Sequence, residues 1–204
     1  MTASLQLQLL NGGEPSIDSA FAGIERIDVG RGAWLDVLPR WVHGSDRLFE
    51  DLEEGVGWQR HQMIMYDRVV DQPRLSAALA PDEWKRWPVL CEMAGALSER
   101  YREEFSTCWV NFYRDGRDGV AWHGDRTGRR ELEALVAIIS LGHPRRFLLR
   151  PKGGGTSLRF DLGRGDLLVM GGSCQRTFEH SVPKTKHAGP RISVTFRPVP
   201  AGEY

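Results

Sequence analysis

Two side chains that commonly bind metal ions, those of His123 and Asp125, are two residues apart in the segment WHGD, residues 122–125. In an extended segment, side chains at this spacing project to the same side. An imidazole and a carboxylate suit a divalent iron ion, and a second histidine beside them would leave coordination positions open for substrate and oxygen. His180, in FEHSVPK, is the candidate for that second histidine. The spacing alone is weak evidence, because it also occurs by chance in turns and at surfaces.

A second pattern places two arginines on one predicted strand. The segment RISVTFR, residues 191–197, alternates between apolar and polar side chains, and its polar positions are Arg191, Ser193, Thr195 and Arg197. The two arginines are six residues apart, roughly 20 Å at about 3.3 Å per residue, so their side chains could lean together around a short dicarboxylic acid. Arginine suits this role because its planar group pairs with a carboxylate through two hydrogen bonds. An exposed polar face would explain the strand equally well.

A third pattern adds neutral hydrogen-bonding groups. In STCWVNFYRDG, residues 106–116, Asn111 and Tyr113 fall on one face of a predicted strand, with Val110 and Phe112 on the other. An amide and a phenol that point inward would add hydrogen bonds to a bound carboxylate. The alternative is again a polar outer face.

The elements that must position these residues change character along the chain. Residues 45–54 predict a short helix with Ser45 as its N-cap. Residues 82–104 predict a longer helix, with Pro88 early in it and an apolar face made of Leu90, Met93, Ala94, Leu97 and Tyr101. From residue 105 on, alternating segments separated by glycine-rich turns predict strands, at residues 107–114, 135–142, 146–150, 157–163, 166–172 and 191–199.

Many short strands with tight turns favour an antiparallel sandwich or barrel over a parallel α/β sheet. The predicted fold class is therefore mainly β with flanking helices (α+β). A mixed N-terminal part, residues 1–104, supports a C-terminal jelly roll, residues 105–204, and 204 residues suffice for one compact domain.

The composition predicts a cytoplasmic protein. The chain has 27 basic and 27 acidic residues, which argues against a polycation that coats nucleic acid but leaves room for a local basic groove. Its three cysteines are scattered, so they suggest reduced thiols and no CxxC zinc site. No secretory signal or membrane-spanning segment is expected from the sequence. His143, before Pro144, and His187, in a polar loop, are expected at the surface.

Taken together, these segments resemble the AlkB family of nucleic-acid dealkylating dioxygenases. The resemblance covers about half of the chain, in four ordered motifs: NFYRDGRDGVAWHGD (111–125), SLG with RRF (140–147), GDLLVMGGSCQRTFEHSVPK (165–184) and RISVTFR (191–197). It implies a double-stranded β-helix core with an N-terminal lid for nucleotide recognition. It also implies iron(II), 2-oxoglutarate as cosubstrate, and O2.

The resemblance also implies roles for single residues. It makes His123, Asp125 and His180 the iron ligands and catalytic residues. Arg191 would bind the distal carboxylate of 2-oxoglutarate, and Arg197 would lie near the carboxylate beside the metal. Further contacts to the cosubstrate are expected from Asn111, Tyr113, Ser193 and Thr195.

For the substrate, the lid would include residues 61–76. Candidate contacts are Tyr66, Arg74, Thr127, Arg150 and Lys152. The sequence departs from the family at three places. Thr127 stands where many members carry an acid that contacts the base, the stretch after Arg74 has no aromatic residue, and Ser193 stands where asparagine is common.

The implied activity is oxidative removal of N-alkyl groups, such as those of 1-methyladenine or 3-methylcytosine, from DNA or RNA, with release of formaldehyde, succinate and CO2. The expected partner is alkylated DNA, with RNA as an alternative and without a membrane, and the protein is expected to be a monomer; DNA repair and a regulatory role both stay open. Three alternatives stay open at this point: the same oxygenase chemistry on a protein or small molecule, a zinc hydrolase with the same ligands, and a nucleic-acid-binding module without catalysis.

Overall fold

The computed structural model describes residues 13–65, 68–124 and 133–198, and this part of the chain is mainly β, as the sequence predicts. Its strands form an eight-stranded sheet, a four-stranded sheet and a two-stranded pair, and all recorded pairings are antiparallel. In spatial order the large sheet contains β2 (Glu25–Gly30), β3 (Ala33–Leu38), β12 (Asp166–Gly172), β9 (Val136–Gly142), β14 (Arg191–Pro198), β7 (Phe105–Tyr113), β6 (Arg68–Leu79) and β5 (Gln59–Met65).

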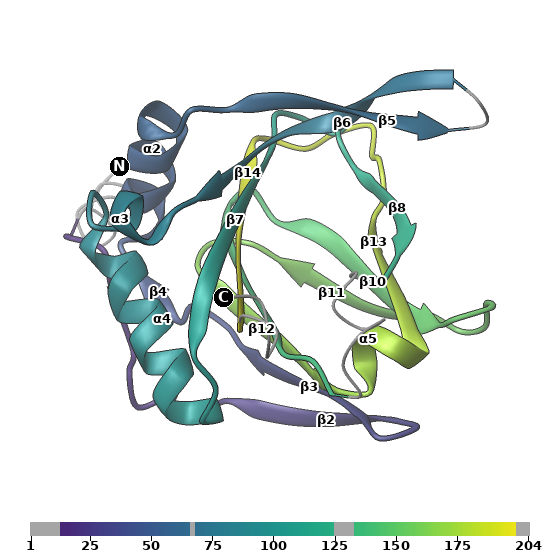
Figure 1. Ribbon diagram of the computed structural model, residues 1–204, viewed down its shortest axis with the longest axis horizontal. Coiled ribbons are helices and arrows are strands. Elements are labelled where there is room, and N and C mark those ends of the chain that lie inside the picture. The colour runs from purple at the N-terminus through teal and green to yellow at the C-terminus, as the bar shows by residue number, and fades with distance from the viewer. Residues whose placement is uncertain (1–12, 66–67, 125–132, 199–204) are drawn as a thin grey trace, which may run out of the picture.

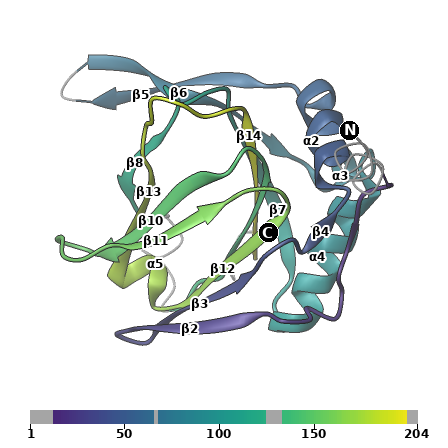
Figure 2. The ribbon, with the colours of Figure 1, turned by 180° about the vertical axis from the view of Figure 1, so that it is seen from behind.

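The small sheet faces the large one across the barrel (Figures 1 and 2). Its strands are β11 (Leu158–Leu162), β10 (Arg145–Pro151), β13 (Phe178–Val182) and β8 (Val120–His123), and the two-stranded pair joins β1 (Ser16–Ile17) to β4 (Val42–His43). The predicted strands after residue 105 are confirmed, with shifts of one or two residues at their ends. Two facing antiparallel sheets make the predicted jelly roll.

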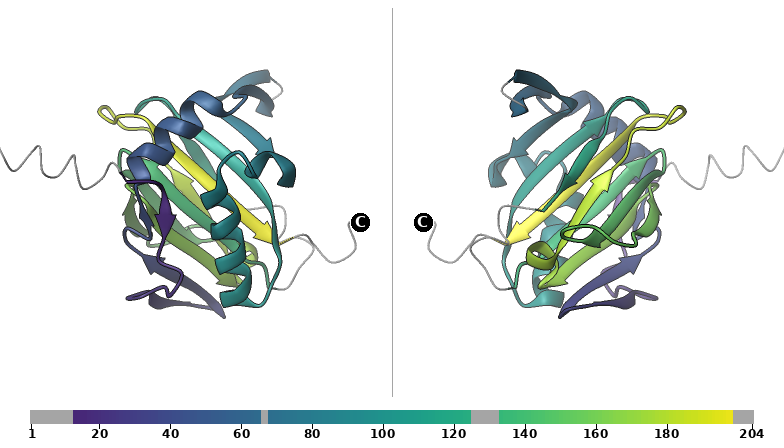
Figure 3. Two further views of the ribbon diagram at one scale, coloured as in Figure 1. Left: turned by 90° about the vertical axis from the view of Figure 1, so that its left-hand side faces the viewer. Right: turned by 90° about the vertical axis from the view of Figure 1, so that its right-hand side faces the viewer.

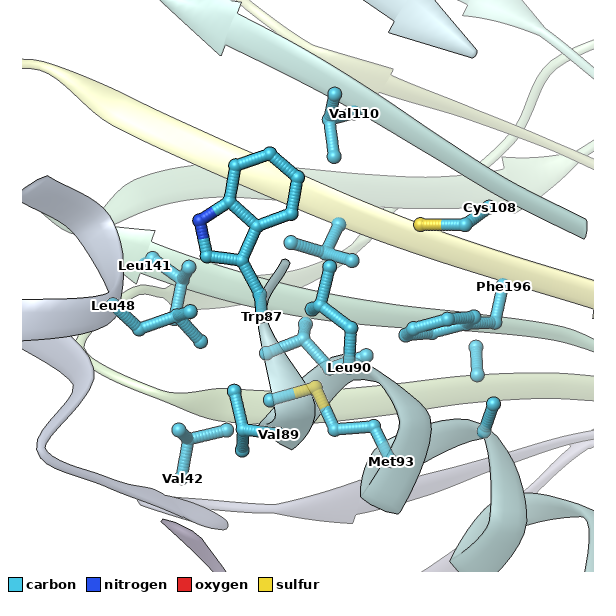
Figure 4. Packing of buried hydrophobic residues seen from close by; sticks show 14 of the residues in the cluster. Val42, Leu48, Trp87, Val89, Leu90, Met93, Cys108, Val110, Leu141 and Phe196 are labelled. Atoms are coloured by element: carbon cyan, nitrogen blue, oxygen red, sulfur yellow. The ribbon is translucent and has the colours of Figure 1, made fainter. Parts of the chain in front are cut away.

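Helices cover the outer face of the large sheet (Figure 3). They are α2 (Ser45–Gly55), α3 (Pro81–Trp84) and α4 (Pro88–Tyr101), while the short α5 (Cys174–Thr177) lies beside the start of β13. The side chains of Ile192, Val194 and Phe196 on β14 are fully buried under this helix layer. Figure 4 shows Leu90 and Met93 of α4 in the same apolar cluster, with Phe196 nearby.

A second apolar cluster fills part of the space between the two sheets. It includes Val136, Ile138 and Met170 of the large sheet and Phe147 and Phe178 of the small one. Strand β9 is buried along nearly its whole length because both faces of the large sheet are covered. The alternating strands thus contribute one face to the helix layer and the other to the barrel interior.

The predicted helix over residues 82–104 is wrong in its extent, because the chain breaks after α3 and restarts at Pro88. A residue that precedes proline is disfavoured in the α conformation, and Trp87 accordingly has φ −127° and ψ 86°. The helix ends at Tyr101, after which Arg102 adopts the left-handed conformation, with φ 57°. The predicted apolar face is confirmed for Leu90, Met93, Ala94 and Leu97, which are buried.

The predicted N-cap is also wrong. Ser45 is the first residue of α2, and the position before it is Gly44, with φ 63°. A β-carbon at Gly44 would lie 2.5 Å from the backbone oxygen of Gly13, so the close approach of two backbone segments requires glycine here.

Strands β5 and β6 form a hairpin at one edge of the large sheet, and it extends beyond the barrel (Figures 1 and 2). The described parts of the predicted lid, residues 61–65 and 68–76, belong to this hairpin, and Tyr66 lies outside the described residues. Along its inner half β6 pairs with β7, so the hairpin backbone is continuous with the sheet that lines the barrel. In the described ranges, no helix has the length and apolar character needed to cross a bilayer.

We expect Leu90→Ala to lower the free energy of unfolding by about 2–5 kcal/mol, because it leaves a cavity at a fully buried position between α4 and the large sheet. Urea denaturation measures this change. Glu92→Ala, on the exposed face of the same helix, is the control and should stay within about 0.5 kcal/mol of the unmodified chain. Equal effects of the two substitutions would contradict the assigned helix orientation.

Candidate active site

A cavity of about 740 Å³ lies between the two sheets. The inner face of the large sheet lines it with Asn111, Tyr113, Arg191, Ser193, Thr195 and Arg197. These are all six predicted cosubstrate residues. They come together because positions two apart on β7 and β14 face the same side, and the two strands pair directly.

Two histidines face each other on the opposite wall. His123 on β8 and His180 on β13 are cross-strand partners, and their ring centroids are 4.3 Å apart. His180 is buried and packs against the ring of Phe147, with centroids 5.3 Å apart. The sequence alone places His180 only at a strand end or loop, whereas the structure puts it inside β13.

The ring of His123 is held by its own strand. Its Nδ1 lies 2.9 Å from the carbonyl oxygen of Ala121, which fits a ring that keeps a proton on Nδ1 and offers Nε2 as a metal ligand. The residue that follows, Gly124, has little space, since a β-carbon there would lie 3.2 Å from the carbonyl oxygen of Gln175. The third predicted ligand, Asp125, lies outside the described residues. The structure therefore places two of the three predicted ligands side by side.

Arg191 is the most unusual charged residue of the cavity. It is 1% exposed, and its Nη2 donates a hydrogen bond of 2.7 Å to Oγ of Ser140. Its Nε and Nη1 have no partner among the described residues. Burial lowers the pKa of this guanidinium, and the nearby charge of Arg145 acts in the same direction. A buried cation with two unused donors favours an anion beside it, because burying an unpaired charge is costly.

A second buried guanidinium, that of Arg145, supports the same region. It donates hydrogen bonds to three backbone carbonyls, those of Asp115, Asp118 and Pro183, at 2.8–3.0 Å. The ring of Tyr113 lies 5.0 Å from the guanidinium carbon of Arg191 and 5.7 Å from that of Arg145. Sequence reasoning missed this role of Arg145, although the residue belongs to the RRF motif.

The predicted substrate residues separate into three groups. Arg74 lines the cavity, and its Nε donates a 2.9 Å hydrogen bond to Oδ1 of Asn111. Arg150 forms an ion pair of 2.6 Å with Glu179 and lies over the ring of Trp122, away from the cavity lining. Tyr66 and Thr127 lie outside the described residues.

Lys152 lies close to the metal-binding segment without lining the cavity. Its Nζ donates a 2.9 Å hydrogen bond to the carbonyl oxygen of Gln175, and its side chain lies beside Gly124. Contacts of Lys152 and Arg150 with a substrate stay predictions. His143 and His187 are exposed, as predicted from the sequence.

The donor set fits the groups that the sequence resemblance implies. Two imidazoles on paired strands suit iron(II) as two of its ligands. The unused donors of Arg191 suit a carboxylate at the far end of the same cavity. Among the described residues no group of three His, Cys, Asp or Glu side chains could hold a metal ion, and Asp125 is not one of these residues.

Comparisons with known proteins agree with this geometry. The model of the 2OG-Fe(II) oxygenase superfamily matches residues 43–197. Alpha-ketoglutarate-dependent dioxygenase alkB homolog 3 of Mus musculus is 32% identical in an alignment of 176 positions that covers 76% of this chain and 62% of the mouse protein. DNA oxidative demethylase ALKBH2 of Arabidopsis thaliana is 28% identical in an alignment of 213 positions that covers 84% of this chain and 68% of that protein.

The fold has a solved counterpart in the structure of OsALKBH1. It superposes with a TM-score of 0.56 at 18% identity, over 86% of this chain and 100% of the other. The chain spans about three-fifths of the length of the alkB homolog 3 proteins that it matches.

We expect Arg145→Met to destabilise the protein by on the order of 3 kcal/mol, because three buried carbonyl oxygens lose a charged donor. Thermal and urea denaturation measure the effect. Arg146→Met, at the exposed neighbouring position, is the control and should change stability little. If both variants have the same free energy of unfolding, the hydrogen bonds of Arg145 to the carbonyls of Asp115, Asp118 and Pro183 do not stabilise the fold.

We expect Arg191→Gln to weaken binding of 2-oxoglutarate at least about thirtyfold, since truncating one partner of a buried charge pair costs 2 kcal/mol or more. Calorimetric titration into the iron(II)-loaded, oxygen-free protein measures this affinity. Arg40→Gln, at an exposed position outside the cavity, is the control. Unchanged affinity in a folded Arg191→Gln protein would contradict the assignment of Arg191 as a residue that binds a carboxylate of 2-oxoglutarate.

Proposed function

The chain belongs to the 2OG-Fe(II) oxygenase superfamily and, within it, to the AlkB family, and from this premise we propose that it removes N-linked alkyl groups from bases of DNA or RNA. Family membership implies iron(II), 2-oxoglutarate and O2. The observation that supports the proposal most strongly is that His123, His180 and the buried Arg191 line one cavity.

When bound, iron(II) supplies the oxidation in which O2 converts 2-oxoglutarate to succinate and CO2 and a methyl group leaves the base as formaldehyde. The chain provides binding and orientation for these reactants. We propose that His123, His180 and Asp125 hold the metal and so act as the catalytic residues. His123 and His180 are cross-strand partners that line the cavity, and a set of two histidines and one carboxylate would leave coordination positions open for substrate and oxygen.

The cosubstrate is proposed to lie along the inner face of β14. Arg191 at the start of the strand would bind its distal carboxylate, and Arg197 at the other end would lie near the carboxylate beside the metal. Asn111 and Tyr113 on the neighbouring strand would add hydrogen bonds, and Ser193 and Thr195 complete this polar surface. The two guanidinium groups thus fix the direction in which a dicarboxylic acid lies.

Apolar side chains line the rest of the cavity and limit water near the reacting atoms. Val136 and Ile138 of β9 and Phe147 of β10 lie on its walls, and Val120 and Val182 border it on the side of the histidines. A site without free water strengthens the electrostatic interactions inside it and protects reactive groups from side reactions.

A base stacked inside a duplex cannot reach this cavity, so the substrate base must be extruded or already single-stranded. The β5–β6 hairpin borders the cavity through Arg74 and is proposed to act as the lid over that base. One of the relatives is named a dioxygenase and the other a DNA oxidative demethylase, so the choice between DNA and RNA stays part of the proposal. Action as a cytoplasmic monomer also stays a prediction.

A panel of methylated substrates tests the proposal. Single- and double-stranded DNA and RNA that contain 1-methyladenine or 3-methylcytosine are incubated with iron(II), 2-oxoglutarate and O2, and the products are measured by mass spectrometry. We expect a loss of 14 mass units from at least one nucleic acid, with formaldehyde and succinate formed in equal amounts. Turnover of methylated peptides alone would favour a protein substrate, and turnover without 2-oxoglutarate would favour a hydrolase.

We expect His123→Ala and Asp125→Ala each to lower succinate formation at least about a hundredfold, because an open metal site loses one of its three protein ligands. Succinate release and iron content are measured on the same samples. His143→Ala, at an exposed histidine outside the cavity, should retain the activity of the unmodified protein. Full succinate formation by either ligand variant would refute the metal assignment.

A further inference from the structure

We propose that Trp109 is the surface on which the flat ring of the substrate base stacks, in place of the lid aromatic that the sequence lacks after Arg74. This inference rests on the proposed function and names the residue that recognises its substrate. The ligand class is an unpaired nucleobase with its alkylated edge turned toward the histidines.

The position of Trp109 in β7 provides the first argument. The residue shares a strand face with Asn111 and Tyr113 and, like them, lines the cavity. Yet Trp109 is 42% exposed, whereas Tyr113 is 4% exposed. The cavity is therefore open to solvent at the Trp109 end of the strand and closed at the Tyr113 end, so an entering ring meets the indole first.

Among the described residues, the strand neighbours of Trp109 leave the indole partly exposed. Its cross-strand partners in the sheet are Ala78 on β6 and Thr195 on β14, both with small side chains. Neither side chain is large enough to cover an indole ring. Two longer side chains, those of Arg74 and Arg197, also line the cavity. Arg197 pairs with Thr107, two residues from Trp109, whereas Arg74 precedes Leu75, which pairs with Phe112. The hydrogen bond from Arg74 to Asn111 holds the Arg74 side chain at Asn111.

A comparison with the other tryptophans of the chain supports this argument. All seven lie within the described residues, and six have an aromatic ring or a guanidinium group against the indole: Trp34, Trp41, Trp58, Trp84, Trp87 and Trp122. For Trp109 the described part of the chain provides no such ring contact. The other large exposed apolar side chain there, Leu158, lies on β11 outside the cavity.

An uncovered indole inside a binding cavity suits a flat, polar-edged ring. Stacking of one base on an aromatic side chain changes affinity by about fivefold to a hundredfold, and it tolerates different bases because each has a π-face. Alkylation at a ring nitrogen of adenine or cytosine makes the ring cationic, which strengthens its attraction to the indole. The hairpin residues described near the cavity, 71–76, contain no competing aromatic ring.

The test measures binding and turnover for Trp109→Ala and Trp109→Phe. Binding is followed by fluorescence anisotropy of two labelled single-stranded oligonucleotides, one with a single 1-methyladenine and one without, in the oxygen-free complex with iron(II) and 2-oxoglutarate. We expect Trp109→Ala to bind the methylated strand fivefold to a hundredfold more weakly and the unmethylated strand with unchanged affinity. The kcat/KM for demethylation should fall by the same factor. Trp109→Phe should recover most of both, since its ring also stacks.

Two controls separate this role from others. Leu158→Ala removes an apolar side chain of similar exposure outside the cavity and should leave both measurements unchanged. Calorimetric affinity for 2-oxoglutarate should stay within twofold in both Trp109 variants. If it falls as far as substrate affinity does, Trp109 is a wall of the cosubstrate site and the proposal is overturned.

The remaining outcomes are also decisive. If Trp109→Ala binds and demethylates the methylated strand as the unmodified protein does, the inference fails while the proposed function stands. A loss of affinity for the methylated strand in Tyr66→Ala, tested alongside, would then indicate that Tyr66 is the stacking residue. If the unmodified protein neither distinguishes the two strands nor demethylates any strand, the proposed function fails and the inference fails with it.

Discussion

The burial of one positive charge, that of Arg191, is the constraint on which the arrangement of the site depends. The residue starts β14, the strand between β9 and β7 in the middle of the large sheet, and its guanidinium cannot reach bulk water. One donor is satisfied by Ser140 on the neighbouring strand, and two are not satisfied by any described residue. A charge in such a place is tolerated when an anion completes its hydrogen bonds. We therefore propose that a bound carboxylate relieves this cost and that the buried charge favours an acidic cosubstrate.

The same alternation that buries the core also builds the cavity. Along β14, Ile192, Val194 and Phe196 pack under the helix layer, and the residues between them face the barrel. A shift of one residue in the strand register would exchange these two faces, so the helix layer holds the register on which the site depends. The small sheet makes the matching contribution, because antiparallel pairing of β8 with β13 brings His123 opposite His180 although 56 residues separate them.

How far the sequence predicts this arrangement depends on the range of the interaction. Strand alternation is local, and it correctly predicts which face of β14 and of β7 is polar. Ordered motifs then indicate that remote residues such as His123 and His180 converge.

The helix break at Trp87 depends on the proline that follows it, and a continuous apolar pattern conceals it. Gly44 precedes α2 because a distant backbone segment approaches it, and Arg145 binds carbonyls of two separate loops. No sequence pattern reports such contacts. Whether Arg150 and Lys152 contact a substrate depends on partners that sequence alone does not assign.

Strand β7 brings the substrate and cosubstrate regions together in one nine-residue element. Tyr113, at its closed end, lies beside the two buried guanidinium groups. Asn111, two residues away, accepts a hydrogen bond from Arg74 on the hairpin, which adds a side-chain link to the backbone pairing of β6 with β7. Trp109, two residues further, reaches solvent. Polarity therefore changes along the strand from buried charge to exposed aromatic surface, in the order in which a dicarboxylic acid and a flat ring would occupy the cavity. The lack of an aromatic residue after Arg74 and the exposed indole of Trp109 then have one explanation. The aromatic surface that a base needs is supplied by the sheet, where the strand register fixes its position.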